Sequence, residues 1–492
     1  MTLAKQLLPT VFFDSMSARV NLAVRRLLFL RSDSCKIINM RRSGHQVSLL
    51  TTCFLLAATC VAQTAPSDHE IVAKADAYMN ALARLNRFNG VFLVAREGKV
   101  IVSRSYGMAN FEDAVPNTQQ TRFPIASMTK AFTATAVMML QERSKLSVRD
   151  LICKHLSDCP AAWQQITIHH LLTHTSGIPD YTDFPDWLQT RGQLAPYTST
   201  IDRFKDKPLD FQPGEKYKYS NSGFVLLGHI IERVSGQTYE GYLRDNIFAP
   251  LKMVNTGYDD SKTIIPHRAL GYSREGIRLI RAPYLHMPIS KSAGALYSTV
   301  EDLLLWDKAL STEKLLSQKS LDAMFTVFKG DYGYGWHIDE QFNHRRVFYT
   351  GVILGFKSSI DRYLDDKVAI ILLSNSDDTF INAAIRDLAA IVFGEKYNLP
   401  KERPSVAIDS KIYDAYVGQY ELGSDFILTV SKDGNKLMGE ADGRKFELFP
   451  ETEFKFFVRD FDAQIMFTFV KDESGQVTHL IYNRNQQARK LR

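Results

Sequence analysis

Ser127 and Lys130 form a pair that could attack a carbonyl group. They stand three residues apart in the stretch Ser-Met-Thr-Lys, at the start of a helix predicted over residues 126–143, so both side chains share one helix face. Backbone N–H groups and the positive end of the helix dipole favour a reactive serine there. A lysine can take the hydroxyl proton when its surroundings lower its proton affinity. The pattern alone is weak, because residues 311–314 repeat it in a polar stretch at the end of another predicted helix.

Tyr219 and Asn221 supply a second pair of polar groups. A phenol with an ordinary pKa of about 10 becomes a proton shuttle if a neighbouring cation favours the phenolate. The Asn221 amide can donate to a substrate carbonyl and accept from a lysine. Taken alone, the two residues are better explained as a polar loop before a helix predicted over residues 223–234.

Tyr349, Thr350 and Gly351 lie on a predicted strand. A strand edge with a hydroxyl followed by glycine lets the backbone of a substrate lie alongside it and form hydrogen bonds. Taken alone, a strand that happens to contain glycine is the simpler explanation. Each of the three stretches therefore needs the other two to indicate a site.

His170 and His174, four residues apart on a predicted helix, could suggest a metal site or a catalytic histidine. The sequence lacks the glutamate pattern of a zinc protease, and no Gly-x-Ser-x-Gly occurs in it. Most such histidines belong to a core. We therefore expect no metal and no cofactor.

The elements around these residues predict an α+β fold. A helix over 71–85 and a strand pair over 91–94 and 100–106 precede the serine, and a long, largely helical region follows it to about residue 245. A further helix is predicted over 300–310, with Ser298 and Glu301 as its capping box. Three strands and a last helix follow, predicted over 345–352, 356–362, 367–374 and 380–394. This order predicts an antiparallel β-sheet flanked by helices, with a helical insertion lobe.

After residue 394 the sequence pattern changes from long helices and strands to short β-rich runs. Residues 395–407, with two prolines and several charges, read as a linker. Short β-rich runs separated by glycine turns follow, over 426–430, 436–440, 445–449, 454–458, 465–470 and 477–482. Regular short strands with turn signals predict a small antiparallel β-barrel over residues 408–492.

The net charge of +6 is concentrated at the N-terminus. Residues 1–62 contain 8 Lys or Arg and 2 acids, which leaves 52 of each sign in the remainder. The net charge of the rest of the chain thus gives no reason to expect binding to nucleic acid or to an anionic membrane.

Residues 1–62 are typical of a leader with a signal peptide. Met40 starts a basic segment, an uncharged apolar run over 47–61 follows, and a small residue precedes Gln63. The run is too short for a stable membrane span. We expect Met40 to be the true start and the protein to be exported, to the periplasm or outside the cell. The alternative is an anchor that starts at Met1 and includes the apolar patch over 27–30.

Only Cys153 and Cys159 lie beyond this leader, six residues apart. In an oxidising compartment a lone close pair suggests a disulfide. Two free, partly buried thiols remain an equal alternative. Two sulfurs without a second pair do not predict a metal site.

Together, the Ser-x-x-Lys, Tyr-Ser-Asn and Tyr-Thr-Gly stretches, in this order and spacing, resemble the serine β-lactamase and penicillin-binding protein superfamily. The resemblance covers about residues 70–395 and includes the stretches at 168–179 and 292–299. It is strongest to the class C-like branch, which also holds esterases and D-amino-acid peptidases. It implies a hydrolase domain, which we place over residues 67–394.

The resemblance also implies a role for each site residue. Ser127 would be the nucleophile of an acyl-enzyme, with Lys130 and Tyr219 sharing the roles of general base and acid. Asn221 would position the substrate, and the backbone N–H groups of Ser127 and Val352 would form the oxyanion hole. The expected substrates are small esters, peptides or lactams.

Tyr349 departs from the family pattern. β-Lactamases of this branch have lysine here, and a neutral phenol cannot pair with a substrate carboxylate as an ammonium does. Arg345, on the same strand face, is a possible substitute. The sequence therefore favours an esterase or D-amino-acid peptidase over an efficient β-lactamase. The alternative is a catalytically silent cell-wall peptide or penicillin sensor on the same scaffold.

The predicted barrel resembles the lipocalin-like module appended to many of these hydrolases, and residues 416–420 are typical of its first strand. Carriage of an apolar ligand is a third possible function, although a small barrel is expected to have a filled interior.

Overall fold

The computed structural model describes residues 66–491, apart from 195, 197, 276, 277, 402, 403, 424, 425, 442, 459–465 and 483–485. The predicted leader over 1–62, with its start at Met40, lies outside the described residues. Within them, no helix combines the length and the apolar character needed to cross a membrane.

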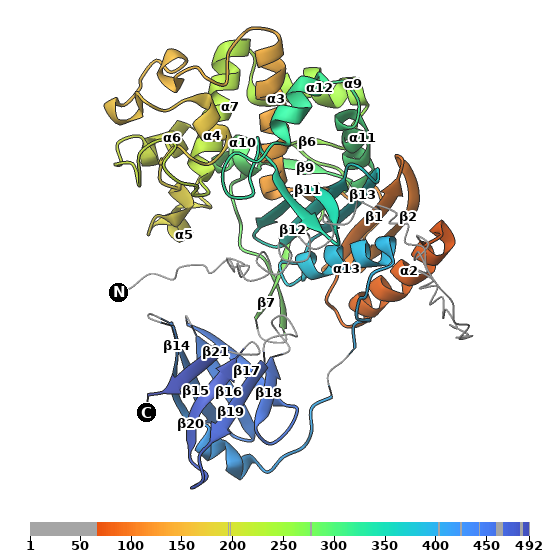
Figure 1. Cartoon of the computed structure of the whole chain (residues 1–492), viewed down its shortest axis with the longest axis vertical. Helices are drawn as coiled ribbons and strands as arrows, with labels where there is room; N and C mark the ends of the chain where they lie inside the picture. The colour runs from red at the N-terminus through yellow and green to blue at the C-terminus, as the bar shows by residue number, and fades with distance from the viewer. Residues whose placement is uncertain are drawn as a thin grey trace, which may run out of the picture. The chain divides into compact units, whose positions relative to one another are not determined.

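The centre of the part before residue 395 is a six-stranded sheet in the order β10-β11-β12-β13-β1-β2, in which all neighbours are antiparallel (Figure 1). Strand β1 of the early hairpin thus pairs with β13, more than 250 residues later in the chain, with Val91 opposite Leu373. The predicted antiparallel sheet is confirmed. Its strands are β1 (Gly90–Arg96), β2 (Lys99–Tyr106), β10 (His337–Gln341), β11 (His344–Ile353), β12 (Phe356–Tyr363) and β13 (Val368–Ser374).

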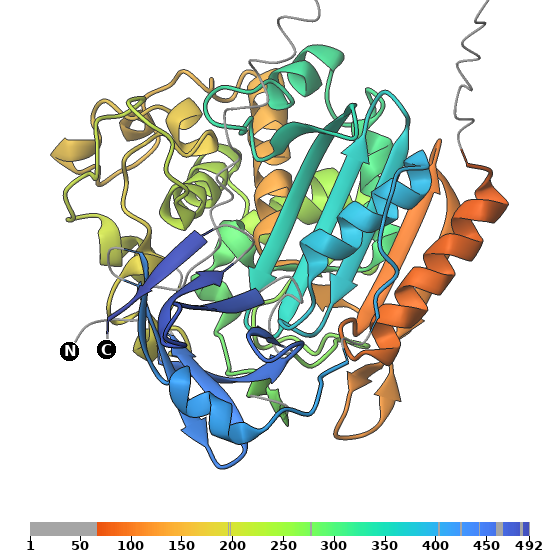
Figure 2. The same ribbon diagram turned by 60° about the horizontal axis from the view of Figure 1, so that its bottom comes forward.

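Helices cover both faces of this sheet because its central strands are apolar on both sides. On β13, Ile370 and Leu372 belong to the core under α2 (Asp68–Arg84) and α13 (Ile381–Phe393), whereas Ile371 and Leu373 face the larger core on the other side. This alternation is the two-residue period of a strand. Figure 2 shows α2 and α13 side by side on the near face of the sheet.

The larger core is built around α3, which is buried almost along its whole length. The helix packs against α7, α10 and α8, so the predicted helical lobe between the two halves of the sheet is present. The helices on this side are α3 (Thr129–Glu142), α4 (Ile168–Leu172), α5 (Trp187–Thr190), α6 (Thr198–Phe204), α7 (Asn221–Ser235), α8 (Tyr239–Leu243), α9 (Ala249–Leu251), α10 (Lys291–Gly294), α11 (Val300–Leu310) and α12 (Gln318–Met324). The short strands are β3 (Met108–Asn110), β4 (Val115–Pro116), β5 (Phe123–Pro124), β6 (Gly257–Tyr258), β7 (Tyr272–Glu275), β8 (Arg278–Arg281) and β9 (Leu296–Ser298).

One cap in this lobe was predicted wrongly. Helix α11 covers the predicted residues, but its N-cap is Thr299 and not Ser298, and the side chain of Thr299 accepts the N–H of Asp302 at 3.3 Å. Ser298 is instead the last residue of β9, and its hydroxyl lies 2.7 Å from that of Thr256. Pairing of β9 with β5 and β6 thus takes Ser298 away from the helix.

Cys153 and Cys159 form a disulfide in the loop after α3. Of the two alternatives that the sequence left open, the bonded pair is the one in the structure. The bond links the short helix Ile152–Lys154 to the segment that leads toward α4.

The C-terminal part is a closed barrel of eight antiparallel strands, which confirms the predicted barrel (Figure 1). Its interior is packed with large side chains, including those of Tyr416, Tyr420, Phe456, Phe469 and Leu480. The sequence missed the last strand and predicted the first one too early. The strands are β14 (Gly418–Gly423), β15 (Phe426–Asp433), β16 (Lys436–Ala441), β17 (Arg444–Pro450), β18 (Lys455–Val458), β19 (Met466–Lys471), β20 (Val477–Tyr482) and β21 (Gln486–Lys490).

Candidate active site

Ser127, Lys130 and Tyr219 meet at the N-terminal end of α3. The Lys130 Nζ donates to the Ser127 Oγ at 3.0 Å, and the Tyr219 hydroxyl lies 2.8 Å from the same Oγ. Ser127 and Tyr219 are partly exposed, whereas Lys130 is fully buried. A hydroxyl, an amine and a phenol from segments about 90 residues apart are therefore in direct contact.

The local backbone presents Ser127 on a tight turn. Ser127 lies in a single 3-10 turn, Ala126–Met128, which leads into α3. Ala126, just before it, has a φ of 48°, a left-handed conformation that is uncommon for a residue with a side chain. Pairing of β5 with β9 fixes the chain before this turn, and the buried helix α3 fixes it afterwards. Both neighbours of Ser127 are buried, so the serine side chain is the one that remains accessible.

Lys130 has its three donor positions matched by three oxygens. These are the Ser127 Oγ at 3.0 Å, the Asn221 Oδ1 at 2.8 Å and the Ala293 carbonyl of α10 at 2.7 Å. Burial lowers the pKa of Lys130 to about 7, against the opposing effect of the Asp180 carboxylate. A large fraction of Lys130 is thus neutral near pH 7, and a neutral amine can accept the proton of Ser127.

Tyr219 keeps its proton more firmly than the sequence suggested. Burial raises the pKa of Tyr219, and the hydrogen bond with Ser127 offsets only part of that rise. Its ring lies over the Lys130 Nζ, 4.9 Å from the ring centroid. The phenol is therefore neutral near pH 7, while the lysine is the group that titrates near neutrality.

Asn221, the first residue of α7, links Lys130 to a buried acid. Its Oδ1 accepts from Lys130, and its Nδ2 donates to the Asp180 Oδ2 at 2.9 Å. The backbone N–H of Asn221 donates to the same oxygen at 3.2 Å. Sequence reasoning missed Asp180, although it directly follows the Gly-Ile-Pro of the stretch that the family resemblance singled out.

The ring of His174 packs against the ring of Tyr219. His174 lies beyond the end of α4 with a φ of 55°, so the prediction that it shares a helix with His170 is wrong. Its Nδ1 accepts the N–H of Ser220 at 3.1 Å, and its ring packs on that of Tyr219 with 4.5 Å between centroids. Burial lowers the pKa of His174 well below its usual value. His174 is a neutral core residue, and the Nδ1 of His170 accepts a backbone N–H from the cap of α4.

The third predicted stretch lies on β11, beside the turn that carries Ser127. A side chain on Gly351 would place its Cβ 2.2 Å from the Ile125 carbonyl oxygen, so only glycine allows this close approach. Among the described strands, β10 pairs with β11 no further than Phe348, and residues 349–353 pair with β12 alone. Thr350 and Val352 are partly or largely exposed along this free edge.

Tyr349 faces inward from the same strand. Its side chain is only 1% exposed, and its hydroxyl lies 3.0 Å from that of Tyr332. Burial raises the pKa of Tyr349 well above its usual value, so the group is a neutral phenol. Arg345 donates to the Phe325 carbonyl at 3.0 Å.

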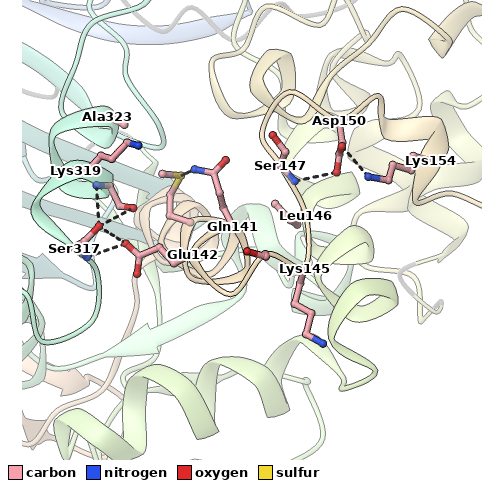
Figure 3. A pocket seen from close by; sticks show the side chains of 13 residues that line it. Gln141, Glu142, Lys145, Leu146, Ser147, Asp150, Lys154, Ser317, Lys319 and Ala323 are labelled. Atoms are coloured by element: carbon pink, nitrogen blue, oxygen red, sulfur yellow. Dashed lines mark hydrogen bonds and ion pairs between the residues drawn. The ribbon is translucent and has the colours of Figure 1, made fainter.

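A surface pocket of about 620 Å³ lies at the other end of α3, around Glu142 (Figure 3). Glu142 accepts both the N–H and the hydroxyl of Ser317, and Asp150 accepts from Lys154. Both acids that line this pocket are thus already bonded to other groups of the chain. Across the part of the chain that the structure describes, no three His, Cys, Asp or Glu side chains gather to hold a metal ion.

Known proteins share this architecture. The family model for β-lactamases matches residues 75–392, and a domain of unknown function, DUF3471, matches residues 402–491. Penicillin-binding protein 4* of Bacillus subtilis is 31% identical over 80% of this chain and 92% of its own length. A penicillin-binding protein from Bacillus halodurans, 31% identical, superimposes with a TM-score of 0.57 over 64% of this chain and 98% of its own. A D-stereospecific amidohydrolase from a Streptomyces species, 25% identical, has a TM-score of 0.57 over 67% and 100%. The chain therefore belongs to the β-lactamase family of serine hydrolases.

Proposed function

We propose that the chain hydrolyses esters or amides through an acyl-enzyme on Ser127. The observation that supports this most directly is the contact of the Ser127 Oγ with both the Lys130 Nζ and the Tyr219 hydroxyl. The Ser127 Oγ bonds to the substrate carbonyl carbon while its proton passes to the neutral Lys130. Tyr219 then carries that proton to the departing alcohol or amine. Water attacks the acyl carbon by the reverse use of the same groups, which frees the acid and restores Ser127.

The negatively charged oxygen of the tetrahedral intermediate needs hydrogen-bond donors. The backbone N–H groups of Ser127 and Val352 are the proposed pair, because glycine at 351 lets β11 approach the turn before Ser127 closely. The positive end of α3 adds to this field. The free edge of β11 offers Thr350 and Gly351 to an extended substrate, and Asn221 is proposed to position its carbonyl side.

The substrate class follows from the neutral phenol at Tyr349. A buried tyrosine bonded to Tyr332 offers no ammonium for a substrate carboxylate, so esters and D-amino-acid amides or peptides fit better than β-lactams. The similarity to a D-stereospecific amidohydrolase supports the amide part of this proposal.

The test is a substrate panel of p-nitrophenyl esters, D-alanyl amides and peptides, and nitrocefin. We expect turnover of esters or D-amino-acid amides, little nitrocefin turnover, and loss of activity in Ser127→Ala and Lys130→Met. Lys314→Met is the matched control, because Lys314 ends the second Ser-x-x-Lys stretch and is exposed. Rapid nitrocefin turnover would contradict the role given to Tyr349, and full activity in Ser127→Ala would contradict the mechanism.

A second candidate is a penicillin-binding sensor that acylates without turnover. It is favoured by the relatives named as penicillin-binding proteins. Intact-mass spectrometry after incubation with penicillin separates the two candidates. A stable adduct on Ser127, with no ester or amide turned over, supports the sensor.

We also propose that the protein is exported. The disulfide between Cys153 and Cys159 suits an oxidising compartment, and the predicted leader would take the chain there. Fractionation of cells that produce the full chain tests this, and recovery only from the reducing cytosol would contradict it.

A further inference from the structure

Asp180 is a buried carboxylate beside the proposed site and belongs to none of its three motifs. It is 4% exposed and stands just before the short helix Tyr181–Asp183. Its Oδ1 accepts the N–H of Thr182 at 3.0 Å, and its Oδ2 accepts both N–H donors of Asn221. All these groups donate to the carboxyl oxygens, which is the pattern of an ionised carboxylate.

The first consequence concerns the Asn221 amide. Because Nδ2 faces the Asp180 carboxylate, Oδ1 must face Lys130, and it does so at 2.8 Å. A turned amide would place its oxygen against the carboxylate and its NH2 against the ammonium, with two repulsive contacts. Asp180 thus fixes which Asn221 atom meets the lysine.

The second consequence concerns charge. The groups that face Lys130, besides the uncharged Ala293 carbonyl, are Ser127, Tyr219, Asn221 and the more distant His174. The pKa of Tyr219 is raised by burial and that of His174 is lowered by burial, so both are neutral near pH 7.

Asp180 then supplies the negative charge that opposes the burial of the Lys130 ammonium. Burial raises the pKa of Asp180 itself, as does the nearby Asp183, and the N–H groups of Thr182 and Asn221 oppose that rise.

We propose that Asp180 is a positioning residue that orients the Asn221 amide and acts as the buried counterion of Lys130. This role rests on the proposed function, because it matters to catalysis only if Lys130 activates Ser127. With Asp180 charged, the pKa of Lys130 stays near 7 instead of falling further. The acid therefore sets the pH range in which the lysine can take a proton and give it back.

The first test is the pH profile of kcat/KM for a neutral ester in Asp180→Asn. Loss of the carboxylate should move the acid limb of the profile down by about one to three pH units, the usual effect of an opposite charge at close range. Asp180→Glu keeps the charge, so the acid limb should lie at the same pH as in wild type, although the rate is lower. Asp183→Asn is the matched control, since it removes an exposed acid three residues away, and its limb should stay in place.

A second readout needs no turnover. In protein labelled with ¹⁵N at lysine Nζ, the Lys130 signal is identified by its loss in Lys130→Arg, and its titration is compared between wild type and Asp180→Asn. A shift to lower pH supports the proposal even if no substrate is found, which separates its failure from failure of the proposed function. An unmoved titration overturns it. If both Asp180 variants fail to fold by circular dichroism, the residue serves the fold and the proposal is also overturned.

Discussion

The pH dependence of wild-type acylation follows directly from the burial of Lys130. With the pKa of Lys130 at about 7, the neutral fraction rises from about 3% at pH 5.5 to about 90% at pH 8. The rate constant kcat/KM for a neutral p-nitrophenyl ester should therefore rise about 30-fold over this range and then level off. An ordinary exposed lysine would instead give a rate that still climbs tenfold per pH unit at pH 8.

The same shift predicts a change in stability. Burial holds the pKa of Lys130 below the usual 10.5, so between these values the unfolded chain binds the additional proton and stability from this group rises with pH. Between pH 6 and pH 9 the gain is roughly 3 kcal/mol. Urea unfolding of wild type and Lys130→Met at both pH values measures the combined effect of Lys130 and its counterion Asp180, because the other titrating groups are common to both proteins.

Two results would refute this reasoning. One is a pH-independent kcat/KM between pH 5.5 and pH 8, measured where Ser127→Ala shows no activity. The other is an unfolding free-energy difference between wild type and Lys130→Met that does not change with pH. The first result would mean that the protonation state of Lys130 does not control the reaction. The second would mean that Lys130 remains charged in the folded protein across this range.

Three further predictions concern other parts of the hydrolase domain. Gly351→Ala would place a Cβ 2.2 Å from the Ile125 carbonyl oxygen, so β11 must move. Because one oxyanion donor is then misplaced, kcat should fall about 100-fold. Steady-state kinetics checks this, provided that the circular dichroism spectrum is unchanged. Arg362→Ala leaves the buried Asp307 without its ion-pair partner at 2.6 Å and should cost about 3–5 kcal/mol in urea unfolding, whereas a loss below about 1 kcal/mol would contradict the burial of that pair. Cys153→Ser opens a loop of sequence separation 6 and should cost about 2 kcal/mol, seen as a lower Tm that dithiothreitol no longer changes.

The sequence predicted most of the hydrolase sheet because its strands are apolar and bounded by turns. It missed β10, whose residues His337–Gln341 are polar except for Ile338, because an edge strand needs only one buried side chain to be held. It missed β21, which is not an edge strand, because only Ala488 among Gln486–Lys490 is buried and the apolar signal is too weak. Both strands are determined by their pairing with neighbouring strands, and the local sequence pattern carries no information about that pairing.

The site was predictable in its residues but not in its electrostatics. Lys130 and Lys314 stand in the same Ser-x-x-Lys pattern, yet one is fully buried and the other exposed. That difference comes from α7 and α10, which pack on α3 from far along the chain. Asp180 escaped notice for a related reason, because its meaning depends on Asn221, 41 residues later.

The filled interior of the eight-stranded barrel limits what that domain can recognise. With Tyr416, Phe456 and Phe469 packed together inside it, a guest molecule would have to displace aromatic rings rather than enter an empty chamber. Among the described residues, every strand of the closed sheet also has two neighbours, so an extended peptide finds no unpaired strand there to join. In the described part of this domain, the side chains that face outward are therefore the ones that a partner can reach.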